Sequence, residues 1–73
     1  MATKDELLTA FQENYEILVS YATAIAGNRE NALDVVQTLA VKLLETDGRE
    51  VQTPLAFLYA MTRRVAIDMY RHE

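Results

Sequence analysis

The sequence predicts an all-α fold, a compact bundle of three helices without a strand. Apolar residues recur at alternating steps of three and four, the spacing that places them on one face of a helix. Residues that cap helices and residues that break them stand at the ends of the periodic segments. Of the 73 residues, 51% are apolar, which is enough for one small core.

The first predicted helix runs from about Asp5 to the Gly27-Asn28 pair. Thr3 or Asp5 can cap its N-terminus, because a side-chain oxygen there accepts from a backbone N–H of the first turn. Glycine tolerates the left-handed conformation that commonly ends a helix. One apolar seam of about five turns joins these ends, made by Leu8, Phe11, Tyr15, Leu18, Ala22 and Ile25.

The second predicted helix spans about Asn31–Glu45, with Asn28 or Asn31 as its cap. Its core stripe contains Ala32, Val36, Leu39 and Leu43, with Val35 and Ala40 at the margins. A second side of this helix is also largely apolar and carries Leu33, Gln37, Val41 and Leu44. So short a chain can hardly bury both sides, so we expect the second one to dock a partner or another copy of the chain.

The third predicted helix follows the turn signal Asp47-Gly48 and begins at Pro54, with Thr53 as its cap. The face predicted to be buried carries Leu55, Leu58, Thr62, Val65 and Met69, with Met61 beside it. The other sides interleave rings with charged groups, on one strip Phe57, Arg64, Asp68 and Arg71, and on another Tyr59, Arg63, Ala66 and Tyr70. Such a mixture suits bases and phosphates; the alternative is that the rings pack on neighbours and water surrounds the arginines.

The composition argues against several classes of function. There is no cysteine, and His72 is the single histidine. With no nucleophile–base set, metal-ligand spacing or glycine-rich phosphate loop, we predict that the protein is not an enzyme and has no cofactor or metal. No apolar run approaches the roughly 20 residues that span a bilayer, so we expect a cytoplasmic protein.

The charge is unevenly distributed. A net charge of −4 opposes indiscriminate binding to nucleic acid. Residues 1–50 hold four basic and nine acidic side chains (−5), whereas residues 51–73 hold three basic and two acidic ones (+1). The last helix therefore escapes most of the negative charge, and charge close to a contact matters more than the total.

Two segments resemble the bacterial sigma-70 family of transcription initiation factors. Region 2.2 of its compact extracytoplasmic-function group, with a pattern like A-E-D-L-V-Q-E-T-F-L-R-L, resembles ENALDVVQTLAVKLLE. The matching residues are Ala32, Asp34, Val36, Gln37 and Leu43. Regions 2.3 and 2.4, with a pattern like W-L-x-x-I-A-x-N-x-x-x-D-x-x-R, resemble PLAFLYAMTRRVAIDMYRH, where Phe57 replaces the tryptophan and Leu58, Asp68 and Arg71 are in register. The first helix is similar to region 2.1.

The chain departs from the family pattern at several positions. Leu33 and Thr38 replace acidic residues, Ala40 replaces a large aromatic residue, and Thr62 replaces the usual alanine. Arg64 replaces the usual asparagine, which weakens the case for fine readout of promoter bases. An arginine-containing segment here resembles the iron-starvation subgroup, whose members are controlled by membrane-spanning anti-sigma regulators.

The resemblance implies a non-catalytic subunit that tethers RNA polymerase to a promoter. The second helix would dock on the β′ clamp helices of core RNA polymerase through Leu33, Asp34, Gln37, Val41 and Lys42. The last helix and the loop before it would melt the −10 element of promoter DNA and hold its non-template strand, through Arg49, Phe57, Tyr59, Arg63, Arg64 and Arg71. An anti-sigma factor is a further expected partner. Residues 1–73 would form one region 2 domain, without the region 4 that reads the −35 element.

Other interpretations of these residues stay open. Asp34 also suits a helix N-terminus as a simple charge near the positive end of the dipole. Asp68 is spaced to pair with Arg64 or Arg71, and we favour this local role because a carboxylate repels phosphate. The alternative for the whole chain is a small helical protein-interaction or homodimerisation module without DNA binding.

Overall fold

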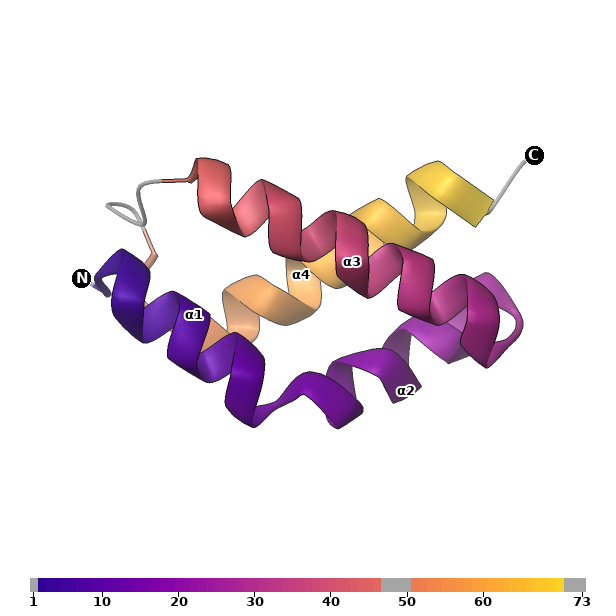
Figure 1. The fold of residues 1–73 in the computed structure, drawn as a ribbon, viewed down its shortest axis with the longest axis horizontal. Helices are drawn as coiled ribbons and strands as arrows, with labels where there is room; N and C mark the ends of the chain where they lie inside the picture. Colours follow the sequence, from indigo (N-terminus) through magenta and orange to yellow (C-terminus); the bar gives the residue numbers. More distant parts are fainter. Residues whose placement is uncertain (1, 47–50, 71–73) are drawn as a thin grey trace.

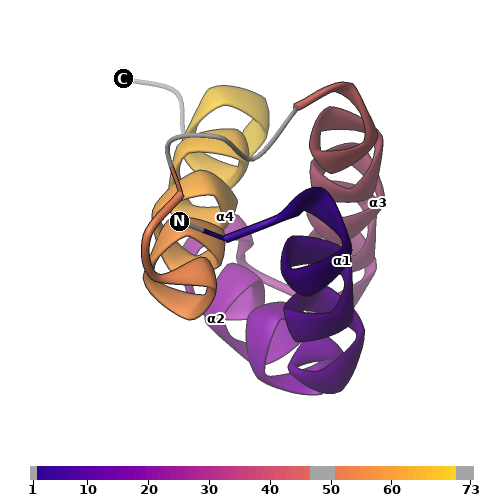
Figure 2. The same cartoon turned by 90° about the vertical axis from the view of Figure 1, so that its left-hand side faces the viewer.

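The structure, a computed structural model, describes residues 2–46 and 51–70. Within these ranges it contains four helices and no strand: α1 (Lys4–Glu13), α2 (Tyr15–Ala26), α3 (Arg29–Glu45) and α4 (Pro54–Tyr70). In Figure 1, α1 and α2 follow one another below α3, and α4 passes behind it. Seen from the end in Figure 2, α4 lies on one side and α1 and α3 lie on the other, with α2 beneath. The all-α prediction is confirmed.

The predicted first helix is in fact two helices that meet at Asn14. The Asn14 backbone leaves the helical region, with φ −112° and ψ 18°. Its side-chain amide donates to the Ala10 carbonyl at 2.8 Å, the same oxygen that accepts the Asn14 backbone N–H at 3.0 Å. Asparagine offers the backbone this local alternative to a continuing helix. The prediction of a single seam was therefore wrong at its middle, where Tyr15 is 39% exposed.

The helix ends follow the capping residues. The Thr3 hydroxyl accepts from the Glu6 backbone N–H at 3.1 Å, while the Glu6 carboxylate accepts from the Thr3 N–H at 2.9 Å. This reciprocal capping box starts α1. Asn28 caps α3, because its side-chain oxygen accepts from the Asn31 N–H at 2.8 Å. Gly27 ends α2 with φ +99°, a conformation that favours glycine.

Two clusters of buried side chains form the core. One lies among α2, α3 and the C-terminal half of α4, and contains Val19, Ala22, Ala26, Ala32, Val35, Val36, Val65 and Ala66. The other joins α1 to the opposite ends of α3 and α4, and contains Ala2, Leu7, Leu18, Leu39, Leu43, Val51 and Leu58. The predicted core stripe of α3 is confirmed. None of the four described helices is long and apolar enough to cross a membrane.

The buried face of α4 is rotated from the predicted one. Leu58, Thr62 and Val65 are buried as expected, and the Thr62 hydroxyl donates to the Leu58 carbonyl at 2.6 Å. Leu55, predicted to be buried, is 38% exposed, whereas Ala66, predicted to lie on a polar strip, is fully buried. Because α4 packs against α2 as well as α3, its buried face turns toward the side that carries Ala66.

Candidate protein-docking and nucleic-acid interfaces

The outer side of α3 exposes a row of apolar side chains. Leu33 is 37% exposed, Val41 57% and Leu44 59%, and Gln37 between them is also exposed. We call these four residues the α3 strip. Their exposure agrees with the prediction that this side is left over when α3 has packed. Large apolar side chains grouped on one exposed face of a helix are typical of a docking surface.

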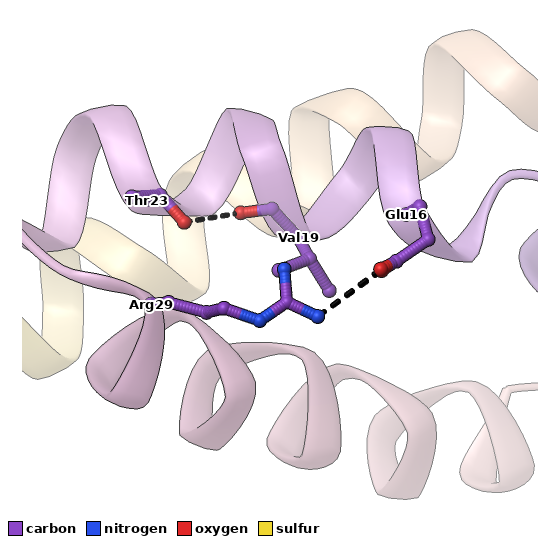
Figure 3. A network of polar contacts seen from close by, with 4 residues as sticks. All are labelled: Glu16, Val19, Thr23 and Arg29. Atoms are coloured by element: carbon purple, nitrogen blue, oxygen red, sulfur yellow. Dashed lines mark hydrogen bonds and ion pairs between the residues drawn. The ribbon is translucent and has the colours of Figure 1, made fainter.

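An ion pair flanks the N-terminal end of the α3 strip. Arg29 Nη2 lies 3.1 Å from one carboxylate oxygen of Glu16 and 3.3 Å from the other, joining α3 to α2 (Figure 3). The two side chains are 62% and 66% exposed, so the pair stabilises the fold by less than about 1 kcal/mol. Arg29 and Leu33 are one turn apart and share a side of α3. The pair therefore forms a polar margin beside the α3 strip.

Thr23, near this pair in Figure 3, bonds within its own helix. Its hydroxyl donates to the Val19 carbonyl at 2.7 Å. The bond satisfies a half-buried hydroxyl without using a group of α3. The polar link between α2 and α3 in this view is therefore the Glu16–Arg29 pair.

Asp34 borders the α3 strip and also contacts α4. Gln37 and Val41 follow it by three and seven residues, so all three share one side of α3. The Tyr70 hydroxyl, near the end of α4, donates to Asp34 Oδ2 at 2.9 Å. Asp34 is therefore more than a charge near a helix N-terminus, because its carboxylate has a specific partner.

Two adjoining hollows between α3 and α4 form what we call the α3–α4 groove. One is lined by Lys42, Leu43, Glu45, Thr46, Phe57 and Met61. The other is lined by Lys42, Met61, Arg64, Val65 and Asp68. The shared residues Lys42 and Met61 show that the hollows adjoin. The groove thus brings two cations and one aromatic ring together, a combination that can hold a phosphate and a base.

The candidate nucleic-acid residues of α4 lie on different sides of the helix. Phe57 and Arg64 line the α3–α4 groove. Tyr59 instead meets Tyr21 of α2 edge to face, with ring centroids 5.1 Å apart and planes at 89°. Arg63 and Arg64 are both exposed, and Phe57 and Tyr59 are half-buried against the core. The candidates Arg49 and Arg71 lie outside the described residues, as does the first half of the loop from Gly48 to Thr53.

Lys42 lies between the two candidate surfaces. It was grouped with the docking residues, yet it lines both parts of the α3–α4 groove beside Phe57 and Arg64. Lys42 is exposed, and it follows the buried Val35 by two turns of α3, at the margin of the core stripe. This spacing was a signal that Lys42 borders the packed side of α3, but periodicity does not say which neighbouring helix lies beside it.

Asp68 lines the groove together with Arg64, but the two are not paired. Among the residues that the structure describes, Glu16 and Arg29 form an ion pair, whereas Arg64 and Asp68 do not. The other pairing expected for Asp68, with Arg71, involves a residue outside the described ranges. In residues 2–46 and 51–70, no group of acidic or histidine side chains is arranged to hold a metal ion.

Comparison with known proteins identifies a family. The family model described as Sigma-70 region 2 matches residues 10–73, a stretch that includes all of α2, α3 and α4. No curated protein and no solved structure matches the chain. The family model covers well over half of the sequence and includes both the α3 strip and the α3–α4 groove.

Proposed function

Because the chain belongs to the sigma-70 region 2 family, we propose that its two exposed surfaces serve two different partners in transcription initiation. Family membership makes the protein a non-enzymatic sigma factor domain with a role in promoter recognition and in binding core RNA polymerase. We assign polymerase binding to the α3 strip with Asp34, and promoter binding to the α3–α4 groove with the exposed side of α4. Residues 1–73 are taken as one region 2 domain.

The exposed apolar surface of α3 supports the first assignment. A polymerase surface that covered Leu33, Val41 and Leu44 would remove three large apolar side chains from water, and each one gains roughly 1.5–3 kcal/mol when fully buried. Leu33 gains less than the other two side chains, because it is only 37% exposed before docking. In this proposal the docking surface of the polymerase is the pair of β′ clamp helices, and Gln37 and Asp34 supply polar contacts at the margin.

The chemistry of the groove supports the second assignment, and this is the observation that carries the proposed function. Lys42 lines one hollow with the Phe57 ring and the adjoining hollow with Arg64, so two cations from different helices line the same groove as the ring. Each cation that neutralises a phosphate raises the affinity and makes it more sensitive to salt. A base stacked on the ring adds roughly 1–3 kcal/mol. Single-stranded DNA, whose bases are free to stack, suits this site better than a closed duplex, which agrees with a melted −10 element.

Acidic residues restrict the path of the DNA backbone. Glu45 lines one hollow of the groove and Asp68 lines the other. Both carboxylates repel phosphate, so the backbone is expected to pass close to Lys42 and Arg64 and to leave the groove along Arg63. Tyr59 lies on the α2 side, where its ring packs on Tyr21. Its contribution to DNA binding is therefore smaller than that of Phe57.

Fluorescence anisotropy of a labelled single-stranded −10 oligonucleotide, with core polymerase present, tests this function. We expect affinity to rise as salt is lowered, and the combined variant Arg63→Ala/Arg64→Ala to bind more weakly with a shallower salt dependence. The non-template strand should bind better than the template strand. Absence of binding with core polymerase present would contradict the DNA assignment and favour the alternative.

That alternative is an interaction or homodimerisation module that uses the α3 strip without binding DNA. The exposed Leu33, Val41 and Leu44 side chains favour it as strongly as they favour polymerase. Sedimentation of the chain alone separates the two, because self-association through the strip makes the apparent mass depend on concentration.

The finer parts of the proposal rest on the family resemblance. Membership of the extracytoplasmic-function group rests on the region 2.2 pattern of the second helix, and membership of its iron-starvation subgroup rests on Arg64 at the usual asparagine position. An anti-sigma factor would then be a partner that competes with polymerase for exposed surface, and the site of action would be the cytoplasm. Co-purification with core polymerase, with and without a candidate regulator, tests this part.

A further inference from the structure

Tyr70 links the last turn of α4 to Asp34 on α3. Its hydroxyl donates to Asp34 Oδ2 at 2.9 Å, across 36 positions of sequence. The pKa of Tyr70 is raised, mainly by this hydrogen bond, and further by burial and by the charges of Asp34 and Glu30. The hydroxyl therefore keeps its proton at neutral pH and remains a donor.

The core, rather than the surface, sets the position of the Tyr70 ring. The side chain is half-buried and packs against the cluster that contains Val36 and Ala66. A ring held by such packing has little freedom, since its two χ angles are restrained by its neighbours. An exposed aspartate has more freedom than this. The hydrogen bond consequently orients Asp34 more than it orients Tyr70.

Asp34 is placed to act on whatever binds the α3 strip. It is exposed and shares a side of α3 with Gln37 and Val41. A carboxylate accepts hydrogen bonds on two oxygens. In the described part of the chain, the hydrogen bond from Tyr70 goes to Oδ2. Oδ1 has no donor among the described residues, so a partner that covers the strip can donate to it without displacing Tyr70.

We propose that Tyr70 is a positioning residue for protein docking, which holds the Asp34 carboxylate at the edge of the α3 strip so that Oδ1 accepts from an arginine or lysine of the partner. The inference rests on the proposed function, in which that partner is core RNA polymerase. A carboxylate oriented before docking loses less rotamer freedom when the complex forms. Ordering one side chain at an interface corresponds to an effect of about two- to tenfold on affinity.

The test is a binding titration of the 73-residue chain with core RNA polymerase. Tyr70→Phe removes the hydroxyl and keeps the ring that packs on the core, so we expect Kd to rise about two- to tenfold. Tyr21→Phe is the matched control, because it also removes one tyrosine hydroxyl from a half-buried ring but lies on α2. This control should bind as the unmodified chain does.

A double-mutant cycle separates positioning from a general effect on packing. In an Asp34→Ala background, Tyr70→Phe should leave Kd unchanged, because there is no carboxylate left to orient. An equal loss of affinity with and without Asp34 would overturn the proposal, since Tyr70 would then act through the fold. Tighter binding by Tyr70→Phe would also overturn it, because the hydrogen bond would then compete with the partner.

The proposed function and this inference fail in different ways. If the unmodified chain binds core polymerase and Tyr70→Phe binds equally well, the positioning role is wrong while polymerase docking stands. If the unmodified chain does not bind core polymerase, the proposed function is wrong and the role of Tyr70 falls with it.

Discussion

The two exposed sides of α3 differ in the forces that they offer a partner. The α3 strip presents Leu33, Val41 and Leu44, whose gain on binding comes from removal of apolar surface from water. The α3–α4 groove presents Lys42 and, from α4, Arg64, whose gain comes from charge and is screened by salt. A single helix can therefore face a protein on one side and a nucleic acid on the other.

In the proposed function, this difference separates two kinds of binding within one small domain. One side of α3 is buried, and the character of its two other sides depends on which helices lie next to them. Where α4 approaches, a groove forms and charges from two helices combine; where no described element covers α3, the apolar side chains stay at the surface. Salt dependence should thus distinguish the two surfaces, and the following predictions go from the largest expected effect to the smallest.

The largest effect should be a loss of stability when a side chain on the buried side of α3 is shortened. This buried side is the reference for both exposed surfaces. Leu39 is fully buried, whereas Leu44 on the same helix is 59% exposed. Leu39→Ala should lower the free energy of unfolding by about 2–5 kcal/mol, and Leu44→Ala should lower it by less than about 1 kcal/mol. Thermal unfolding followed by circular dichroism measures both. Equal losses would mean that the α3 strip belongs to the core.

A charge placed in the α3 strip should weaken docking without unfolding the domain. Leu33→Glu loses the burial of a leucine and adds a carboxylate that must be desolvated, so we expect core polymerase binding to fall by roughly 2–3 kcal/mol, or about 30- to 150-fold. Ile17→Glu on α2 is the matched control, because Ile17 is a similar apolar side chain that is 51% exposed. If Leu33→Glu melts the domain, Leu33 is a core residue and the docking surface is misplaced.

Substitution of Lys42 tests where the boundary between the α3 strip and the α3–α4 groove lies. Lys42→Ala should weaken binding of the −10 single strand and reduce the slope of log affinity against log salt by about 0.7–1. Polymerase affinity measured without DNA should stay unchanged, since Lys42 lines the groove rather than the α3 strip. A loss of polymerase affinity with an unchanged salt slope would restore Lys42 to the docking surface.

The smallest effect concerns the capping box of α1, which adjoins the far end of the α3 strip, where the Lys4 ammonium donates to the Leu44 carbonyl. The pKa of Glu6 is lowered, mainly by the hydrogen bond from the Thr3 backbone and further by a hydrogen bond with the Thr3 side chain. A lowered pKa in the folded state means that the ionised form is stabilised there. The contribution is present above the unfolded-state pKa of about 4.5 and is lost as pH falls through the lower folded-state value.

Thermal unfolding between about pH 2 and pH 7 measures this contribution. Glu6→Gln can keep a capping hydrogen bond but cannot titrate. It should be slightly less stable than the unmodified chain at neutral pH, and the difference should vanish in acid. Glu13→Gln, at the opposite end of α1, is the control. A difference between the chains that persists at low pH would mean that the charge of Glu6 is not responsible.

Much of the fold was predictable because helix ends are local. The Thr3 and Asn28 caps and the end of α2 at Gly27 use side chains or backbone angles within a few residues of the helix terminus. The break at Asn14 was missed although asparagine is a weak helix former, because the apolar spacing continued across it. An asparagine inside a long seam was the available signal for two helices instead of one.

The candidate surfaces were predicted less completely. Periodicity identified the α3 strip, since any side of a helix outside its core stripe can be recognised from spacing. It placed Leu55 inside and Ala66 outside, which the structure reverses, because α4 is covered by more than one neighbour. The Tyr70–Asp34 bond could not be predicted, since nothing local relates two residues that are 36 positions apart.

The amino-acid sequence by itself determined that this chain is helical, where most of its helices begin and end, which stripe of α3 is buried, and the family that its segments resemble. Only the tertiary structure decided that Lys42 faces α4, that Tyr59 packs on Tyr21, and that Tyr70 holds Asp34. The reason is that capping and periodicity act over one or two turns of a helix. In contrast, which helix lies next to each exposed side depends on how the helices pack against one another. That packing is determined by the buried faces of all the helices together.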